Sequence, residues 1–256
     1  MKIFRNLLFL TLGLAVFASC SSDDEKVIPE GEKSPVQVVL RSIISNDVET
    51  YKAEVNPLNL EALYMNIAEI EFEISDEMED VLPGGNKVYT DVELKGPFPI
   101  NLLSKEVQNG LTLSTTKVPN GIYDEIEFEF DVYKGEHKGF ENLLGNTIYA
   151  SGSFDLGEIV IPFVIKSKEE MEVELEYENE PLVLDGSSSK IFIDINLDKV
   201  VLELIKNAAV DFAGATKEED GSILIDKNTN SNILKKFEKA LEMAFEAIED
   251  AHEEKN

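Results

Sequence analysis

The chain has 256 residues but only one cysteine, two histidines and no tryptophan. A single cysteine cannot form a disulfide within the chain, so stability has to come from a hydrophobic core. His137 and His252 do not have the spacing of a metal site such as HExxH. The sequence also lacks a Gly-x-Ser-x-Gly nucleophile elbow and the glycine-rich loops that hold phosphates. We therefore predict that the protein is not an enzyme and uses no cofactor, with a hydrolase built from acidic residues as a remote alternative.

Positively charged residues are scarce as well. The chain has 23 Lys and Arg against 51 Asp and Glu, which gives a net charge of -28. A surface of this sign repels nucleic acid phosphates and anionic lipid headgroups. The composition therefore argues against nucleic acid as a partner. Apolar residues make up 43% of the chain, which is enough for a core in a protein of this length.

The one nearly unbroken apolar run is short. It covers Leu7–Phe17, follows a basic start with Lys2 and Arg5, and ends in small residues just before Cys20. This order is typical of a secretory signal peptide, and the run is too short to cross a bilayer. Small residues before a cysteine resemble the lipobox of bacterial lipoproteins. The resemblance implies that residues 1–19 are removed and that Cys20 becomes the acylated N-terminus, for example with palmitate; the alternative is an ordinary cleaved signal.

A short acidic segment follows Cys20. The candidate export signal consists of Ser22, Asp23, Asp24 and Glu25. It resembles the lipoprotein export signal of Bacteroidetes-type bacteria, which implies an outer-membrane lipoprotein exposed on the cell surface. The alternative is a plain solvated tether. Residues 20–35 are polar, contain two prolines and have no apolar period, so we predict a lipid-anchored acidic tether there.

Alternation of apolar and polar residues with a period of two dominates residues 36–229. Strict alternation is typical of sheets with one buried and one solvated face. We therefore predict a mainly β fold, an antiparallel β-sandwich of Ig-like or prealbumin-like type. The phase of the alternation slips near Ala68, which indicates a β-bulge. The clearest predicted strands are Pro35–Arg41, Met65–Ile74, Ile126–Val132, Ile159–Ile165, Met171–Tyr177 and Ile191–Leu197.

Glutamates occupy the polar positions of three of these strands. We expect them on exposed faces, where rows of charge guard against edge-to-edge pairing, in preference to a metal site. These rows are Glu69, Glu71 and Glu73, then Glu125, Glu127 and Glu129, and finally Glu172, Glu174 and Glu176.

The last segment, residues 230–256, is predicted to form an amphipathic helix. Its apolar residues are spaced three and four apart, from Ile233 through Phe237 to Ile248. We expect the apolar stripe to dock on the sandwich, because an acidic polar face does not suit a membrane surface. The segment 197–210 fits either a helix or a strand, and we prefer the strand.

Two further patterns are candidates for ligand binding. Asp226, Asn228 and Asn230 offer oxygen ligands at alternating positions, as the start of an EF-hand calcium loop does, but the turn glycine and the final glutamate of such a loop are missing. Capping of the last helix by Asn230 is the favoured interpretation. An aromatic platform for glycans would have to use tyrosines, of which Tyr133 and Tyr149 are closest to predicted loops.

The segment Pro119-Asn120-Gly121-Ile122-Tyr123 joins two predicted strands. Pro119 fixes φ and Gly121 permits a positive φ, so the segment is predicted to be a turn. Strand, Pro-x-Gly-x-Tyr and strand together resemble a family of bacterial lipoprotein domains of unknown function with an Ig-like or prealbumin-like, carbohydrate-binding-type sandwich. The resemblance covers about Pro35–Ile225 and implies a fold and a location but no activity.

These features predict a surface-exposed outer-membrane lipoprotein that is anchored through its N-terminal lipid. We expect it to act as a non-catalytic binding or structural module for a glycan or protein ligand. The alternative is an accessory subunit of an outer-membrane uptake or adhesion complex.

Overall fold

The computed structural model describes residues 32–43, 58–75, 91–155, 157, 159–177 and 181–249. The predicted signal peptide, the lipidation site Cys20 and the export signal Ser22–Glu25 lie outside these residues. Within them, no helix is both long and apolar enough to cross a membrane.

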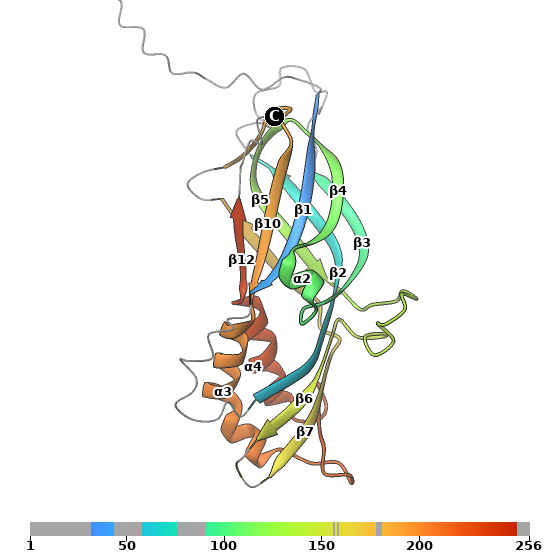
Figure 1. The fold of residues 1–256 in the computed structure, drawn as a ribbon, viewed down its shortest axis with the longest axis vertical. Coiled ribbons are helices and arrows are strands. Elements are labelled where there is room, and N and C mark those ends of the chain that lie inside the picture. Colours follow the sequence, from blue (N-terminus) through green and yellow to red (C-terminus); the bar gives the residue numbers. More distant parts are fainter. Residues whose placement is uncertain are drawn as a thin grey trace, which may run out of the picture.

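Two β-sheets make up most of the fold (Figure 1), so the prediction of a mainly β protein is confirmed. The smaller sheet has the strand order β12-β10-β1-β4, and the larger has the order β11-β7-β6-β2-β5-β8, with β3 paired to β2 and β9 paired to β5. The smaller sheet consists of β1 (Lys33–Ile43), β4 (Leu111–Pro119), β10 (Ser189–Asn196) and β12 (Phe245–Glu249). The larger sheet consists of β2 (Leu58–Ile74), β3 (Val92–Asn101), β5 (Gly121–Phe130), β6 (Ile148–Asp155), β7 (Val160–Ser167), β8 (Met171–Glu176), β9 (Leu182–Leu184) and β11 (Ile223–Ile225). The helices are α2 (Lys105–Asn109), α3 (Leu197–Gly214) and α4 (Ser231–Glu242).

The sheets are mixed, and the prediction of purely antiparallel pairing is wrong. β1 pairs with β10 in parallel, and β11 pairs with β7 in parallel. A charged pair links the two strands of the first parallel pair, because Arg41 Nε donates to Asp194 Oδ1 at 2.7 Å and Arg41 Nη2 donates to Asp194 Oδ2 at 2.9 Å. Asp194 is almost fully buried, and the Arg41 guanidinium also lies 4.2 Å from the centre of the Phe192 ring. Paired charges of this kind fix the register of β1 against a strand that is far away in sequence.

The long strand β2 connects the two ends of the molecule. Its first half pairs with β6 and its second half with β5, while β3 runs along its other side. The register shifts between Ile67 and Glu69 in the pairs with both β3 and β5, which confirms the predicted bulge near Ala68. Buried residues are Leu63, Met65 and Ile67 before the bulge and Ile70, Phe72 and Ile74 after it.

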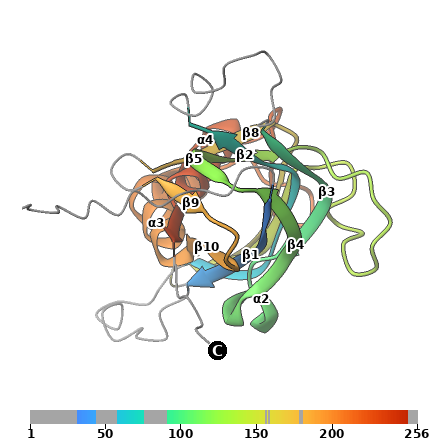
Figure 2. The same ribbon diagram turned by 90° about the horizontal axis from the view of Figure 1, so that it is seen from above.

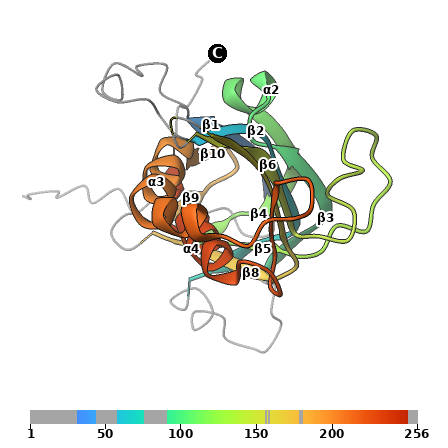
Figure 3. The ribbon, with the colours of Figure 1, turned by 90° about the horizontal axis from the view of Figure 1, so that it is seen from below.

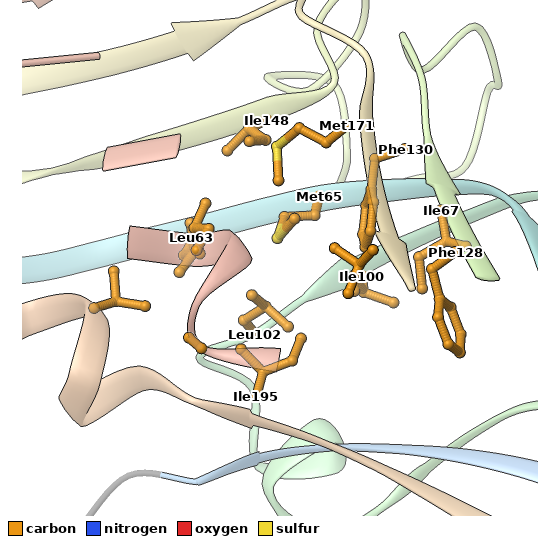
Figure 4. Close-up of a cluster of buried hydrophobic side chains, with 14 of the residues drawn as sticks. Leu63, Met65, Ile67, Ile100, Leu102, Phe128, Phe130, Ile148, Met171 and Ile195 are labelled. Atoms are coloured by element: carbon orange, nitrogen blue, oxygen red, sulfur yellow. The ribbon is translucent and has the colours of Figure 1, made fainter. Parts of the chain in front are cut away.

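The larger sheet curls around an interior that it shares with the smaller sheet (Figure 2). β3 lies beside β4, and β8 lies beside β12, so the two sheets approach each other at both sides. Figure 4 shows Leu63 and Met65 of β2 facing the same interior as Phe130 of β5 and Ile195 of β10. These side chains belong to one continuous hydrophobic core, which stabilises the fold in place of disulfides.

The segment 197–210 is part of the helix α3, and the preference for a strand is wrong. The buried residues Leu197, Val200 and Leu204 are three and four apart, so they share one helical face. Phe212, near the end of α3, stacks on Phe154 of β6 with ring centres 4.6 Å apart. α3 and α4 lie side by side, as Figure 3 shows from below. The packing of this segment on β6 and α4 favours the helix, and it outweighs the preference of the β-branched residues for a strand.

The predicted amphipathic helix is confirmed in its first part only. α4 starts at Ser231 and buries Ile233, Leu234, Phe237, Ala240 and Leu241, so it docks on its own chain as expected. It ends at Glu242, and the chain turns through Met243 and Ala244 into β12. β12 pairs antiparallel with β10, which extends the smaller sheet. The prediction of a helix through Ile248 is therefore wrong, because pairing with β10 outweighs the three-and-four pattern.

The segment Pro119–Tyr123 carries the chain from one sheet to the other. β4 belongs to the smaller sheet and β5 to the larger, so the segment is a corner between sheets, not a hairpin. Gly121 does not have a positive φ, in contrast to the prediction. The buried Tyr123 instead fixes the corner, since its hydroxyl donates to the carbonyl oxygen of Pro119 at 2.9 Å.

The burial pattern predicts the effect of truncating a core side chain. Phe128 on β5 is 0% exposed, so Phe128→Ala should lower the free energy of unfolding by about 3–5 kcal/mol through the cavity it leaves. Urea unfolding followed by circular dichroism measures this. The control Val160→Ala removes an apolar side chain that is 59% exposed and should cost less than about 0.5 kcal/mol. Equal losses at the two positions would contradict the assignment of inner and outer faces.

Candidate functional site

Nine glutamates lie on one outer face of the larger sheet, opposite one another on β2, β5 and β8. The register forms three rows, which we call the glutamate lattice: Glu69-Glu129-Glu172, Glu71-Glu127-Glu174 and Glu73-Glu125-Glu176. Like charges directly opposite each other destabilise a sheet. The alternation in the sequence predicts each row along its strand, but the cross-strand register could not be read from it. Protection of a sheet edge explains the glutamates of the terminal strand β8 at most, because β2 and β5 are inside the sheet.

One corner of the lattice is neutralised by a lysine on the neighbouring strand β3. Lys95 Nζ lies 3.2 Å from Glu69 Oε2 and 2.7 Å from Glu93 Oε2. The hydrogen bond from Lys95 and its charge lower the pKa of Glu93. This pair is exposed, so it adds little to stability.

The opposite corner has no such partner. Carboxylate oxygens of Glu73, Glu125 and Glu127 lie within 4.8 Å of one another. In the part of the chain that the structure describes, no Lys or Arg forms an ion pair with these three. Burial raises the pKa of Glu127 to about 7, and the charges of Glu172 and Glu129 contribute to this shift. Such a set of oxygens is of the kind that Ca²⁺ or Mg²⁺ prefers, but three ligands are fewer than either ion usually takes.

The raised pKa of Glu127 predicts how stability depends on pH. The folded chain holds this proton more tightly than the unfolded chain, whose pKa is near 4.5, so the contribution of Glu127 to stability is full below about pH 4.5 and is lost as the pH rises through about 7. Glu127→Gln should therefore raise the free energy of unfolding by about 0.5–1 kcal/mol at about pH 8 and by less at about pH 5.

The measurement is urea unfolding at both pH values. The control Glu61→Gln removes an exposed acid on the same strand outside the lattice and should change stability by less than about 0.5 kcal/mol at either pH. A gain for Glu127→Gln that is the same at both pH values would contradict the coupling of this carboxyl to its neighbours.

A polar cavity of about 390 Å³ lies where β7 ends, beside the loop 144–146 and the turn 226–228. Strand and helix positions supply part of its wall, since Lys166 belongs to β7 and Leu234 to α4. The remaining lining residues are Leu144, Gly145, Asn146, Lys168, Glu169, Asp226, Lys227 and Asn228. Several different elements thus surround one space with polar groups together with the apolar side chains of Leu144 and Leu234, and ligand sites combine both kinds of group.

The structure places the three calcium candidates apart. Asp226 and Asn228 line this cavity, whereas the side chain of Asn230 faces the loop before α4. Its Nδ2 donates to the carbonyl oxygens of Thr216 at 3.0 Å and of Leu224 at 2.8 Å, and its Oδ1 accepts from the Thr216 N–H at 2.9 Å. Asp226 Oδ1 accepts from the N–H groups of Asn228 and Thr229. These bonds stabilise the turns around α4, and Asn230 makes no side-chain cap bond to that helix, in contrast to the prediction.

The two candidate tyrosines differ in accessibility. Tyr133 is 1% exposed, and its hydroxyl lies 2.9 Å from His137 Nδ1, so it does not form a surface platform. Tyr149 on β6 is half-buried and stacks on Tyr64 of β2, with ring centres 5.9 Å apart and planes 23° apart. Tyr149 also lies opposite Lys166 in the register of β6 and β7. The stacked tyrosine pair therefore adjoins the polar cavity on the outer face of the sheet.

The lattice row that contains Glu129 and Glu172 borders a second cavity. It has a volume of about 310 Å³ and is lined by Glu129, Asp131, Glu170 and Glu172, among others. Its carboxylates are the acids that a hydrolase would use in this part of the molecule.

The chain belongs to the family described as a domain of unknown function (DUF4382), which matches residues 48–210. The match includes the three strands of the glutamate lattice and Lys166, Lys168 and Glu169 of the polar cavity. No curated protein and no solved structure matches the chain.

Proposed function

We propose that this member of the DUF4382 family is a lipid-anchored, non-catalytic binding or structural module on the outer face of the outer membrane. The basic start, the short apolar run and Cys20 support the lipid anchor. The acidic segment that ends with Asp23, Asp24 and Glu25 supports surface export. We include in the proposal an Ig-like or prealbumin-like relationship, which is supported by two sheets packed on one core.

The observation that carries the binding role is the polar cavity beside the stacked tyrosines. Lys166 on β7, Leu234 on α4 and Tyr149 on β6 are positioned by regular elements, whereas the loop 144–146, the segment after β7 and the turn 226–228 supply the other side chains. The strand and helix positions are the better preorganised part of the site. A glycan or a protein side chain would fit the mixture of amides, charges and apolar groups.

The position of the anchor also favours binding in this part of the molecule. β1 begins at Lys33 at the end of the molecule that lies opposite α3, α4, β6 and β7 (Figure 1). The predicted tether, residues 20–35, overlaps the start of this strand, because Lys33–Pro35 already pair with β4. The half that contains the helices would therefore project away from the membrane.

The alternative of an accessory subunit is weakened by α4. Such a subunit would attach to its partner through the C-terminal helix or through a sheet edge. α4 buries Ile233, Phe237 and Leu241 within its own chain, so the apolar stripe of this helix is not free to dock on a partner. We therefore favour the independent binding module and keep the hydrolase, with Glu129 and Glu172 as its acids, as a remote alternative.

The anchor is tested by Cys20→Ser. Because the acyl chains would supply the membrane affinity and the acidic body none, this variant should remain unprocessed or be released from the membrane. Cell fractionation and the mass of the mature N-terminus measure the outcome, with Ser21→Ala as the control that should behave like the wild type. A Cys20→Ser protein that stays with the outer membrane and has the mass of wild type would contradict the lipid anchor.

The export signal is tested by replacing Asp23, Asp24 and Glu25 together with Ala. We expect the protein to remain on the inner side of the outer membrane, so that protease added to whole cells no longer cleaves it while its total amount is unchanged. The control replaces Glu30 and Glu32 with Ala, which removes acids farther from Cys20. Undiminished cleavage in the triple variant would reduce the acidic segment to a tether.

A further inference from the structure

We infer that the polar cavity at the end of β7 binds a saccharide that carries an anionic group, either a carboxylate or a sulfate. This inference rests on the proposed binding function and adds the chemical class of the ligand.

Three lysines give the cavity its preference for an anion. Lys166, Lys168 and Lys227 come from β7, from the segment after it and from the turn before α4. Among the described residues, none of the three forms an ion pair, although Glu169 and Asp226 line the same cavity. In a chain with 51 acids and 23 bases, a lining of three lysines and two acids is a local excess of positive charge.

The overall negative charge does not cancel this local preference. Charges in water are screened over about 8 Å at physiological ionic strength. An anionic group inside the cavity is therefore governed by the ammonium groups that line it, and charge-assisted hydrogen bonds from lysine are among the stronger polar contacts. The acidic surface still contributes to selectivity for the cavity, because it repels anions from the rest of the protein.

The rest of the lining suits the hydroxyl groups and the ring of a sugar. Asn228, which is exposed, offers an amide group for hydroxyls, and Leu144, which is 58% exposed, offers apolar surface. The Tyr149–Tyr64 pair continues the site along the outer face next to Lys166, and tyrosine combines an apolar ring with a hydroxyl that reaches water. The volume of about 390 Å³ is within the usual range for small-molecule sites, roughly 300–1,000 Å³.

The test uses the full-length protein in detergent and isothermal titration calorimetry. The probes are an oligogalacturonate, the same oligosaccharide as its neutral methyl ester, a sulfated carrageenan oligosaccharide, and inorganic sulfate. We expect the oligogalacturonate or the carrageenan oligosaccharide to bind about tenfold or more tightly than both the methyl ester and inorganic sulfate. The comparison of the two anionic saccharides identifies which anionic group is preferred.

The variant Lys166→Gln/Lys227→Gln should weaken binding of the preferred saccharide by about tenfold, and added salt should weaken the wild type more than this variant. Lys117→Gln, which removes an exposed lysine from β4 in the other sheet, is the matched control and should bind like the wild type. Tyr149→Ala should weaken the saccharide but leave inorganic sulfate unaffected. Circular dichroism before titration establishes that each variant is folded.

The inference would be overturned by equal affinity for the uronate and its methyl ester, by equal losses for the cavity and control variants, or by no binding of any saccharide probe. None of these results would affect the anchor and export experiments, which test the proposed location separately. If a saccharide binds equally well to the Tyr149→Ala variant and to the wild type, the site recognises the anionic group alone. This result would also overturn the assignment to a sugar.

Discussion

The bulge in β2 is the constraint on which the arrangement of both halves depends. β2 is shared by β3, β5 and β6, so its phase decides which side chains of the larger sheet face the core. Without an extra residue, a strand with Leu63 and Met65 inside would also have Glu69 and Glu71 inside. The register shift between Ile67 and Glu69 reverses the phase, so that Ile70 and Phe72 are buried instead. One irregularity thus allows a tyrosine face and a glutamate face on the same side of one strand.

The same strand places the two candidate surfaces next to different neighbours. Before the bulge, Tyr64 meets Tyr149 of β6, and β6 leads across the sheet to Lys166. After the bulge, Glu71 meets Glu127 of β5. A like-charged pair across strands lowers stability, and consistent local choices are what make a sequence fold well. A lattice of such pairs inside a sheet therefore departs from the rule that like charges do not lie opposite each other. Departures of this kind are expected where a protein uses a surface for its function.

The sequence predicted those parts of the fold that depend on a local period. Alternation located β1, β5, β7, β8 and β10, and the phase slip located the bulge at Ala68. The sequence-based prediction was wrong at Leu197–Gly214, where both periods fit and the packing of Phe212 on Phe154 favours a helix. It was also wrong at β12, where pairing with β10 outweighs the helical pattern. The parallel pairing of β1 with β10 and the opposition of glutamates between strands are properties of register, and register between distant segments has no local signal. For the same reason the cavity could not be predicted: the spacing of Asp226 and Asn228 indicates only calcium ligands, and no local pattern marks Lys166 as a binding residue.

The glutamate lattice and the lysines of the cavity can occur in one protein because they lie in different parts of the larger sheet. The lattice sits on the second half of β2 with β5 and β8, whereas the lysines of the cavity sit around the end of β7, beyond β6. Screening limits the reach of each group to about 8 Å, so lysines next to the lattice would pair with it, as Lys95 does with Glu69, and lose their availability. Lys166 instead has the aromatic residue Tyr149 as its neighbour across the strand pair. An aromatic strand position thus separates Lys166 from the acids of the lattice, so that the acids lining the cavity are Glu169 and Asp226, and this separation follows from the order β7-β6-β2 of the sheet.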